Sequence, residues 1–249
     1  MLKYDIKYDL DDPKTTLIHR DIIKAKPFLR KIYEEWYALL FQKIKNIPQS
    51  DILEIGSGGG FLKEIYPNVI TSDIMPLECC DMIFSAEKVP FGDKTLGAIV
   101  MVNVFHHIPK PSHFLKEAQR TLKIGGKIVM IEPANSLFAK FIYQNFHHEP
   151  FDPNGGWEIE SSGPLSGSNQ ALPYIYFERD LKKFENEFPE LKVTSVKYQM
   201  PFRYLVSGGV SRKALVPSWS FGLLKFVEQV LSPLSKQLGM FQTIEIEKK

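Results

Sequence analysis

Short, apolar, β-branched runs alternate with helical patterns through the first half of the chain. The runs span residues 52–55, 69–73, 82–85, 97–102 and 127–131. Each is short enough to be a strand that is buried on both faces. Residues 111–122 repeat apolar positions with a helical period, and we expect Gly125-Gly126 to close that helix. The alternation predicts a parallel, doubly wound α/β sheet with its ligand at the carboxyl ends of the strands.

The flanking segments predict a cap and the closing strands. Residues 27–45 have a helical period that begins at a proline, which indicates an amphipathic helix before the first strand. Residues 192–198 and 241–246 alternate apolar and polar positions, as an antiparallel pair does. We therefore expect a Rossmann-like, seven-stranded mixed sheet, mostly parallel with an antiparallel closing strand and with helices on both faces. A cap would be built from the N-terminal helices and insertions.

A glycine-rich turn after the first strand is the most informative motif. It reads LEIGSGGG, with Gly56, Gly58 and Gly60 in the turn. Glycine lets backbone amides approach a ligand closely, but a dinucleotide fingerprint needs a further glycine where Phe61 stands. Glu54 would repel a diphosphate and attract the ammonium and sulfonium of S-adenosylmethionine. The alternative is an ordinary strand-to-helix turn.

The second apolar run ends in an acid, Asp73. Its offset from the glycine turn is about that at which such folds hydrogen-bond a ribose. A carboxylate there can accept from both ribose hydroxyls. Alternatively, Asp73 caps the turn before Met75-Pro76.

Residues 52–133 resemble the class I S-adenosylmethionine-dependent methyltransferases, in the small-molecule branch that includes quinone and sterol methyltransferases. The matching motifs, in order, are LEIGSGGG, SDI, SAEKVPF, VNVFHHI and RTLKIGGKIVMIEP. The resemblance implies a set of cofactor-binding residues. They are Glu54, Gly56, Ser57, Gly58, Gly60, Asp73, Ile74, Ser85, Ala86, Glu87 and Asn103. Of these, Glu54 and the three glycines would hold the methionyl part, Asp73 the ribose, the four residues from Ile74 to Glu87 the adenine, and Asn103 would face the sulfonium.

Two positions depart from the family pattern. Ser85 and Gly97 stand where the family often has Asp. A serine binds the adenine amino group more weakly than a carboxylate does, which keeps open a non-catalytic S-adenosylmethionine-binding regulatory or assembly protein. A nicotinamide oxidoreductase is a third alternative, and both Glu54 and Phe61 count against it.

We expect one methyltransferase domain over residues 1–249, divided into four parts. They are an N-terminal helical cap (1–50), a cofactor-binding core (51–133), a substrate-side insertion (134–190) and closing strands with an apolar, basic helical insertion (191–249). Aromatic and turn-forming residues in the third part are typical of a binding loop or lid.

Histidines supply the candidates for proton transfer. His147 and His148 precede Glu149 in the insertion, and His107 follows the fourth strand. Adjacent histidines in an extended segment point to opposite faces, so we predict no metal site. The hypothesis is that His148 or His147 serves as a general base, helped by Glu149 or Asp152, with His107 as a further candidate.

Composition limits the partners and the location. The formal net charge is +2, which gives no global reason to expect nucleic acid. Charges interrupt the apolar residues at the start of the chain, and apolar runs stay below about 18 residues, so we expect a cytoplasmic protein. Residues 200–238 are basic, aromatic and apolar, which favours peripheral membrane contact or an apolar pocket, although a packed crossover helix is the simpler interpretation. The expected acceptor is a small apolar, lipid-linked or saccharide-type molecule.

Overall fold

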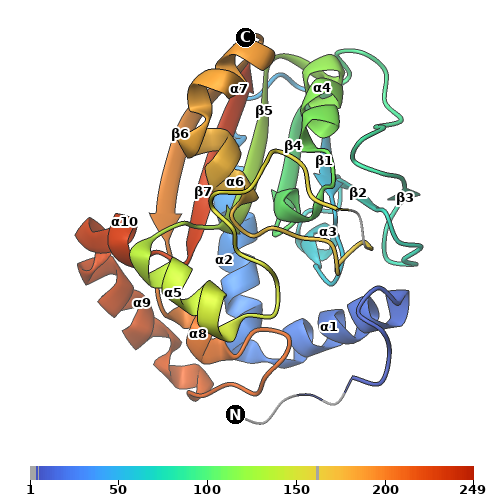
Figure 1. Ribbon diagram of the computed structural model, residues 1–249. Coiled ribbons are helices and arrows are strands. Elements are labelled where there is room, and N and C mark those ends of the chain that lie inside the picture. The colour runs from blue at the N-terminus through green and yellow to red at the C-terminus, as the bar shows by residue number, and fades with distance from the viewer. Residues whose placement is uncertain (1–3, 5, 161–162) are drawn as a thin grey trace.

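A seven-stranded sheet forms the centre of the protein. The computed structural model describes residue 4 and residues 6–160 and 163–249. The strand order is β3-β2-β1-β4-β5-β7-β6, with β7 antiparallel to both of its neighbours and the other pairs parallel (Figure 1). The strands are β1 (Asp51–Ile55), β2 (Ile70–Asp73), β3 (Met82–Ile83), β4 (Leu96–Val102), β5 (Leu122–Pro133), β6 (Leu191–Gln199) and β7 (Phe241–Lys248). The predicted fold class is therefore confirmed.

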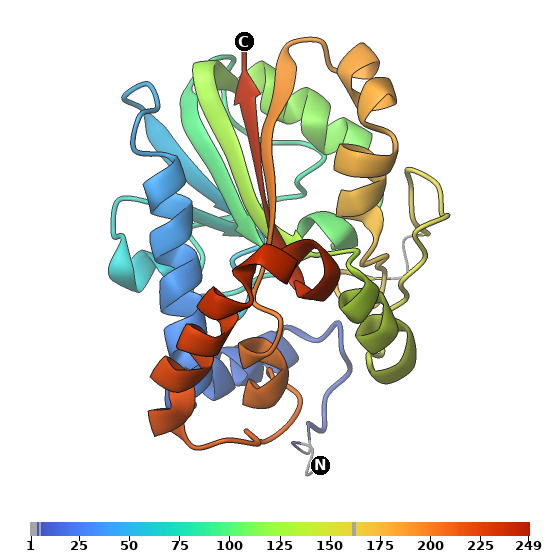
Figure 2. The ribbon, with the colours of Figure 1, turned by 90° about the vertical axis from the view of Figure 1, so that its left-hand side faces the viewer.

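Helices cover both faces of this sheet and one of its ends. The α-helices are α1 (Pro13–Ala25), α2 (Pro27–Lys43), α3 (Leu62–Ile65), α4 (Pro111–Thr121), α5 (Leu137–Phe146), α6 (Leu172–Tyr174), α7 (Leu181–Glu187), α8 (Arg203–Ser207), α9 (Phe221–Val230) and α10 (Ser235–Leu238). Four further short segments are η1 (Phe105–His107), η2 (Ile175–Arg179, a π-helix), η3 (Ser218–Ser220) and η4 (Ser232–Leu234). In Figure 2, α8, α9 and α10 lie together below the sheet, between β6 and β7 in the chain.

Alternate residues of the central strand belong to two different cores. Ala98 and Val100 of β4 pack into the cluster that contains the apolar face of α2. Ile99 and Met101 pack into the cluster that contains α4. Successive side chains of a strand point to opposite faces, so a strand covered by helices on both sides must be apolar throughout. This explains the continuous apolar run that marked β4 in the sequence.

The boundary between α4 and β5 differs from the prediction. The helix ends at Thr121 and the strand begins at Leu122, so Gly125-Gly126 lies inside β5 and does not close the helix. Leu96 pairs with Leu122, whereas Ala98 pairs with Lys127, so extra residues bulge from β5. Gly125 has φ +75°, which glycine adopts without strain. The glycines serve a bulge, which uses the same conformational freedom as a helix cap.

One helix lies inside the expected N-terminal cap at residues where no helix was delimited, and another lies where a loop was expected. α1 begins at Pro13, and the Asp12 side chain caps it by accepting from the Lys14 N–H. α5 lies in the insertion that we expected to form a loop, and Ser136 Oγ caps it by accepting from the Ala139 N–H. Both caps are ordinary helix-start signals. The four-part division of the domain stays a prediction.

Some predictions concern residues that are not described. Residues 1–3 and 5, part of the segment considered for a signal peptide, and Ser161–Ser162 of the insertion lie outside the described residues. Among the helices that are described, each is too short or too polar to cross a membrane.

The segment from 200 to 238 buries part of its positive charge. Arg203 is buried, and its Nε lies 2.5 Å from Glu228 Oε2 on α9. Its Nη1 lies 2.7 Å from Glu35 Oε2 on α2, and Lys225 Nζ lies 2.8 Å from the other oxygen of Glu35. These ion pairs attach α8 and α9 to α2, so Arg203 does not face outward as a membrane-binding residue would.

Candidate active site

The glycine turn joins β1 to α3 under tight steric limits. Gly56 has φ +66°, and a Cβ on it would lie 2.5 Å from a methyl carbon of Val104. A Cβ on Gly60 would lie 2.7 Å from both the Ser57 carbonyl oxygen and the Tyr37 hydroxyl. The Ser57 N–H donates to the Ser72 carbonyl at 2.9 Å, which ties the turn to β2. Larger residues at Gly56 and Gly60 would displace the backbone that lines the expected cofactor site.

Glu54 is a buried carboxylate at the carboxyl end of β1. Ser57 Oγ donates to its Oε2 at 2.6 Å. Burial raises the pKa of Glu54 to about 7, and the Ser57 hydrogen bond opposes that rise only in part. The charged form is thus short of stabilising partners, and a cationic ligand would supply one.

Asp73 lies at the carboxyl end of β2 and faces the glycine turn. Its Oδ2 accepts from the Gly58 N–H and its Oδ1 from the Met75 N–H, each at 2.9 Å. Burial raises the pKa of Asp73, whereas these backbone hydrogen bonds act in the opposite direction. The hydrogen bond from the Met75 N–H matches the alternative in which Asp73 caps the turn before Met75-Pro76. The hydrogen bond from the Gly58 N–H links Asp73 to the glycine turn. Its contact with a ribose stays a prediction.

Asn103 follows β4 in a strained conformation. Its φ is +56°, a backbone angle that residues other than glycine rarely adopt. Its N–H donates to the Ile131 carbonyl at 2.8 Å. Its Oδ1 is buried and has no hydrogen-bond partner among the described residues. Buried polar atoms are nearly always paired, so this oxygen is a candidate acceptor for a ligand.

The residues expected around the adenine lie on the loops after β2 and β3. Ile74 is 52% exposed, which is unusual for a large apolar side chain and leaves it available to a flat ring. Ser85 Oγ accepts from the Glu87 N–H at 3.2 Å, and Glu87 Oε1 accepts from the Lys110 N–H at 3.0 Å. Ala86 is half-buried between them. These adenine contacts stay predictions.

The helix α1 packs directly over the glycine turn. A Cβ on Gly59 would lie 3.0 Å from the Arg20 backbone nitrogen, and a Cβ on Gly58 would lie 3.9 Å from Thr16 Cγ2. The cavity beside Glu54, which Arg20 also lines, measures about 10 Å³. That is roughly the space for one water molecule, so this cavity is too small to hold the cofactor by itself.

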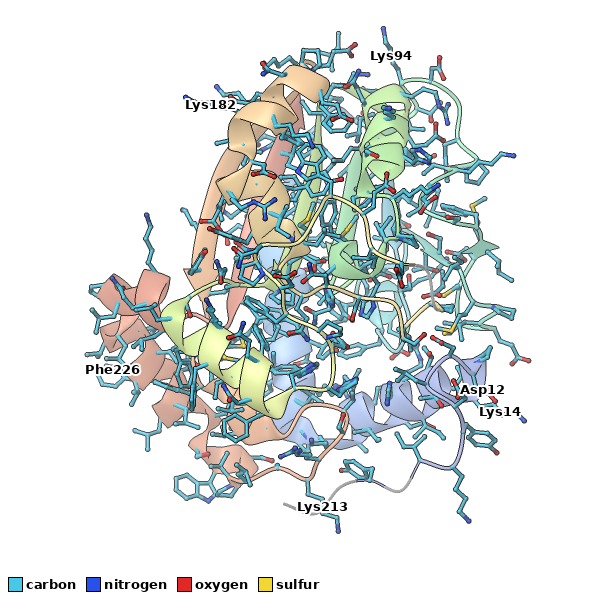
Figure 3. The ribbon with its side chains drawn as sticks, viewed as in Figure 1. Asp12, Lys14, Lys94, Lys182, Lys213 and Phe226 are labelled. Carbon is cyan, nitrogen blue, oxygen red and sulfur yellow. The ribbon has the colours of Figure 1, made fainter. Side chains whose placement is uncertain are left out.

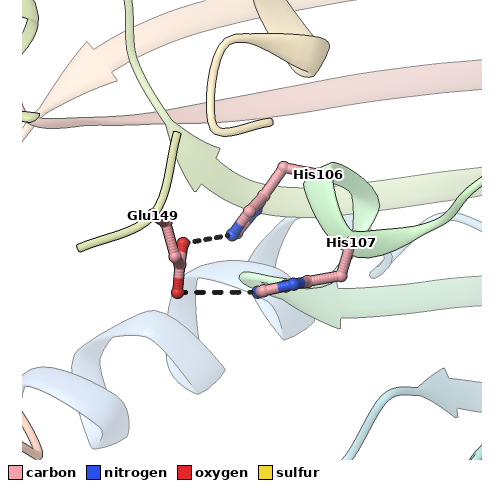
Figure 4. A group of neighbouring side chains, drawn as sticks. All are labelled: His106, His107 and Glu149. Atoms are coloured by element: carbon pink, nitrogen blue, oxygen red, sulfur yellow. Dashed lines mark ion pairs between the residues drawn. The ribbon is translucent and has the colours of Figure 1, made fainter. Parts of the chain in front are cut away.

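A second group of polar side chains gathers at the carboxyl ends of β4 and β5. His106 Nδ1 donates to Glu132 Oε2 at 2.6 Å, and both side chains are buried. Burial alone would lower the pKa of His106, but the Glu132 carboxylate raises it to about 9. Glu149 joins from the loop after α5, with one oxygen 3.4 Å from His106 Nε2 and the other 3.9 Å from His107 Nε2 (Figure 4).

The adjacent histidines of the insertion lie on the same side of the chain. The rings of His147 and His148 stack with centroids 4.7 Å apart, so the expectation that they point to opposite faces is wrong. Gln170 Nε2 donates to His147 Nδ1 at 2.8 Å, whereas the half-exposed His148 lies with its Nε2 3.7 Å from Glu149. Burial lowers the pKa of His147 and of His107 to about 4. Their use as general bases stays a prediction.

Glu132 and its partner His106 are polar residues of this cluster that were not among the candidates from the sequence. Glu132 Oε1 accepts from the Val104 and Phe105 N–H groups, each at 2.8 Å, so it holds the turn that carries His106. The available signal was a lone carboxylate at the end of the apolar run before Pro133. An acid in a run of that kind is costly unless it is paired, which marks it as a candidate for a buried interaction.

Comparisons with known proteins find a methyltransferase domain in this chain. Residues 53–130 match the family described as a methyltransferase domain. Demethylmenaquinone methyltransferase of Symbiobacterium thermophilum is 27% identical over 124 residues, which make up 47% of this chain and 48% of that protein. The chain thus aligns with about half the length of this curated relative.

Solved structures share the fold over nearly the whole chain. A SAM-dependent methyltransferase from Thermotoga maritima has a TM-score of 0.53 at 18% identity, covering 94% of this chain and 100% of that one. Geranyl diphosphate C-methyltransferase from Streptomyces coelicolor has a TM-score of 0.54 at 12% identity, covering 96% and 86%. Residues 53–130 thus carry an S-adenosylmethionine-dependent methyltransferase domain, and the solved structures show that the fold of such domains extends over nearly the whole chain.

Proposed function

We propose that this protein transfers the methyl group of S-adenosylmethionine to a small-molecule acceptor by in-line displacement. The observation that carries the proposal is Glu54, a buried carboxylate beside the glycine turn, because a cationic ligand would offset its cost of burial. The unpartnered Oδ1 of Asn103 supports the same ligand. A carboxylate and an amide oxygen at neighbouring strand ends suit an ammonium and a sulfonium better than a diphosphate.

The chain's own residues would act mainly by positioning. Bound S-adenosylmethionine would supply an electrophilic methyl group, with the electrons of the broken carbon–sulfur bond remaining on sulfur as the acceptor's lone pair forms the new bond. Glu54 would hold the methionyl end and Asp73 the ribose, under a cover that excludes water. An acceptor with a poorly acidic proton would pass it to His148, His147 or His107. The last two have pKa values of about 4, so they are unprotonated at neutral pH but only weakly basic.

Cofactor binding is tested by calorimetry on the full chain. We expect the wild-type protein to bind S-adenosylmethionine with micromolar affinity and Asp73→Ala to abolish the binding. Asp21→Ala makes the same change at an exposed position of α1 and should bind like wild type. Failure of the wild type to bind would contradict the proposal, as would unchanged binding by Asp73→Ala.

Turnover separates an enzyme from a non-catalytic binding protein. Labelled S-adenosylmethionine would be incubated with the protein, with and without cell extract, and S-adenosylhomocysteine measured. Formation only when extract is present indicates an acceptor in the extract, which mass spectrometry of the lipid and saccharide fractions would identify. The curated relative is named for demethylmenaquinone, so a quinone of that kind is one acceptor to test directly. Cofactor binding without turnover in any extract would favour the regulatory or assembly alternative.

An apolar or lipid-linked acceptor is the finer proposal, with a saccharide as the alternative. On α9, four apolar side chains are exposed at the spacing i, i+3, i+4 and i+7. They are Leu223, Phe226, Val227 and Val230. Figure 3 shows Phe226 at the outer edge of the molecule, and Trp219 just before α9 is 80% exposed. An outward apolar stripe is typical of a helix that contacts a membrane surface or a partner.

We propose peripheral contact of this stripe with a membrane, from a cytoplasmic location. Co-sedimentation with anionic lipid vesicles tests the contact. The wild type should sediment with vesicles, and a Trp219→Ser/Phe226→Ser double variant should stay in the supernatant. Ile124→Ser removes an exposed apolar side chain elsewhere and serves as the control. The contact would be ruled out if all three proteins sedimented with the vesicles to the same extent, or if the wild type did not sediment with them.

A further inference from the structure

Three side chains from two segments converge on one small volume. His106 and His107 project from η1, and Glu149 approaches from the loop after α5 with one carboxylate oxygen toward each ring (Figure 4). One ligand atom from each of the three, a ring nitrogen or a carboxylate oxygen, lies within 4.8 Å of the other two. The contacts of Glu149 measure 3.4 Å to His106 Nε2 and 3.9 Å to His107 Nε2.

Hydrogen bonds on the far side of each ring fix which nitrogen faces this volume. His106 Nδ1 lies 2.6 Å from a Glu132 oxygen, and His107 Nδ1 lies 3.1 Å from the Gly167 carbonyl oxygen. A carboxylate and a carbonyl can only accept, so both Nδ1 atoms act as donors. When the rings are neutral, the Nε2 atoms therefore carry the lone pairs that face Glu149, so a metal ion would displace the proton that His106 otherwise holds there. Metal-binding histidines nearly always show this arrangement, with the second nitrogen bonded to a carboxylate or a backbone carbonyl.

Glu132 supports the histidine and leaves the volume free. One of its oxygens accepts from the Val104 and Phe105 N–H groups and the other from His106, so its acceptors are used on its own side. Glu132 and Glu149 together bring two carboxylates to a largely buried region. A divalent cation between the rings would balance both negative charges, which is the condition for burying such charges at low cost.

We propose that His106, His107 and Glu149 bind a divalent transition-metal ion, with Zn²⁺ as the best-suited ion. Two imidazoles and one carboxylate form the ligand set of zinc sites that keep one position open for water or substrate. A tetrahedral ion with bonds of about 2.0 Å holds its ligands about 3.3 Å apart. The ligand atoms here lie within 4.8 Å of one another, so the side chains would close in slightly around a bound ion. This inference revises the sequence expectation of no metal, which considered the neighbouring pair His147 and His148.

The open position would face the reaction side of the sheet. η1 begins two residues after Asn103, at the carboxyl end of β4. An ion there could bind an oxygen of the acceptor and lower its proton affinity. Metal binding itself does not depend on methyl transfer, so it is tested separately.

The test is a titration of chelator-treated full-length protein with Co²⁺, a spectroscopic substitute for Zn²⁺ whose visible absorption reports its coordination. We expect about one bound equivalent with the intense bands of a tetrahedral site, and competition by Zn²⁺. His107→Gln and Glu149→Gln should each weaken binding by about 100-fold or more. Glu132→Gln, which removes only the supporting carboxylate, should weaken it by roughly 10- to 100-fold.

His113→Gln is the matched control, because His113 is half-exposed and pairs with Glu87 away from the cluster. Circular dichroism and S-adenosylmethionine calorimetry on each variant show whether the fold is retained. Absence of stoichiometric Co²⁺ or Zn²⁺ binding to the wild type would overturn the proposal. Equal affinities for His107→Gln, Glu149→Gln and His113→Gln would overturn it as well, since binding would then lie elsewhere. In either case the cluster is a metal-free network in which His106 bridges two carboxylates.

Discussion

Replacing Glu54 by glutamine should change how both stability and cofactor binding depend on pH. Burial raises the pKa of Glu54 from 4.5 to about 7. A carboxyl whose pKa is higher in the folded state contributes stability that is complete below pH 4.5 and is lost as the pH rises to about 7. One pKa unit corresponds to about 1.4 kcal/mol, so ionising the buried side chain costs about 3 kcal/mol. Without ligand, Glu54→Gln should therefore gain about 3 kcal/mol relative to wild type across this range.

Cofactor binding should show the opposite trend in the wild type. A ligand cation favours ionised Glu54, so the apparent affinity should follow the ionised fraction. With a pKa of about 7, the dissociation constant should fall roughly eightfold between about pH 6 and about pH 7.5. Higher pH is avoided because α-amino groups lose their proton near a pKa of about 8. Glu54→Gln should bind more weakly and with little change over this range.

Urea unfolding and calorimetry at a series of pH values measure both trends. Glu78→Gln makes the same change at an exposed position after β2 and should follow the wild type in each assay. A constant difference in unfolding free energy between wild type and Glu54→Gln would refute the proposed burial cost. A pH-independent affinity of the wild type would refute the proposed contact between Glu54 and a cation.

Three other substitutions test the frame around the site. Gly56→Ala should lower the free energy of unfolding by roughly 1–3 kcal/mol, because its Cβ would collide with Val104 at positive φ; a wild-type urea midpoint would contradict this. Asn103→Gly relieves the left-handed backbone, so stability should stay within about 1 kcal/mol of wild type while calorimetry shows weaker cofactor binding. Unchanged affinity would mean that the orphaned amide oxygen has no ligand role. Arg203→Met strands the buried Glu228 and should cost about 3–5 kcal/mol in urea unfolding; a loss below 1 kcal/mol, roughly the value of a surface pair, would show that the ion pair is not held in the core.

The sequence was sufficient for the sheet and the cofactor turn because local chemistry determines both. Strands buried on two faces must be apolar throughout, and a turn that packs against Val104 must use glycine. The same local signal was ambiguous at Gly125-Gly126, since a helix cap and a β-bulge both need a residue at positive φ. Only the pairing of β4 with β5 decides between the two, and pairing is a long-range property.

The packing of α1 over the site was harder to predict than the strand ends and the glycine turn beneath it. α1 carries an aspartate cap and a proline at its start, but it packs its Thr16 and Arg20 against a glycine turn about forty residues away in the chain. Helical periodicity reports which face is apolar and not which loop that face meets. The small cavity beside Glu54, which Arg20 of α1 also lines, reflects that packing.

The histidine cluster combines a predictable part with an unpredictable one. Val102 pairs with Ile131, so once the strand order is known, Glu132 must lie beside the segment that leads from β4 to His106. Glu149 has no such constraint, because the loop after α5 could have met either face of the sheet's end. The pairing of β4 with β5 therefore brings His106 to the buried Glu132 carboxylate. The insertion supplies the second carboxylate, that of Glu149. A change in that loop could alter the chemistry of the acceptor side while the cofactor turn, held by β1 and β2, stays as it is.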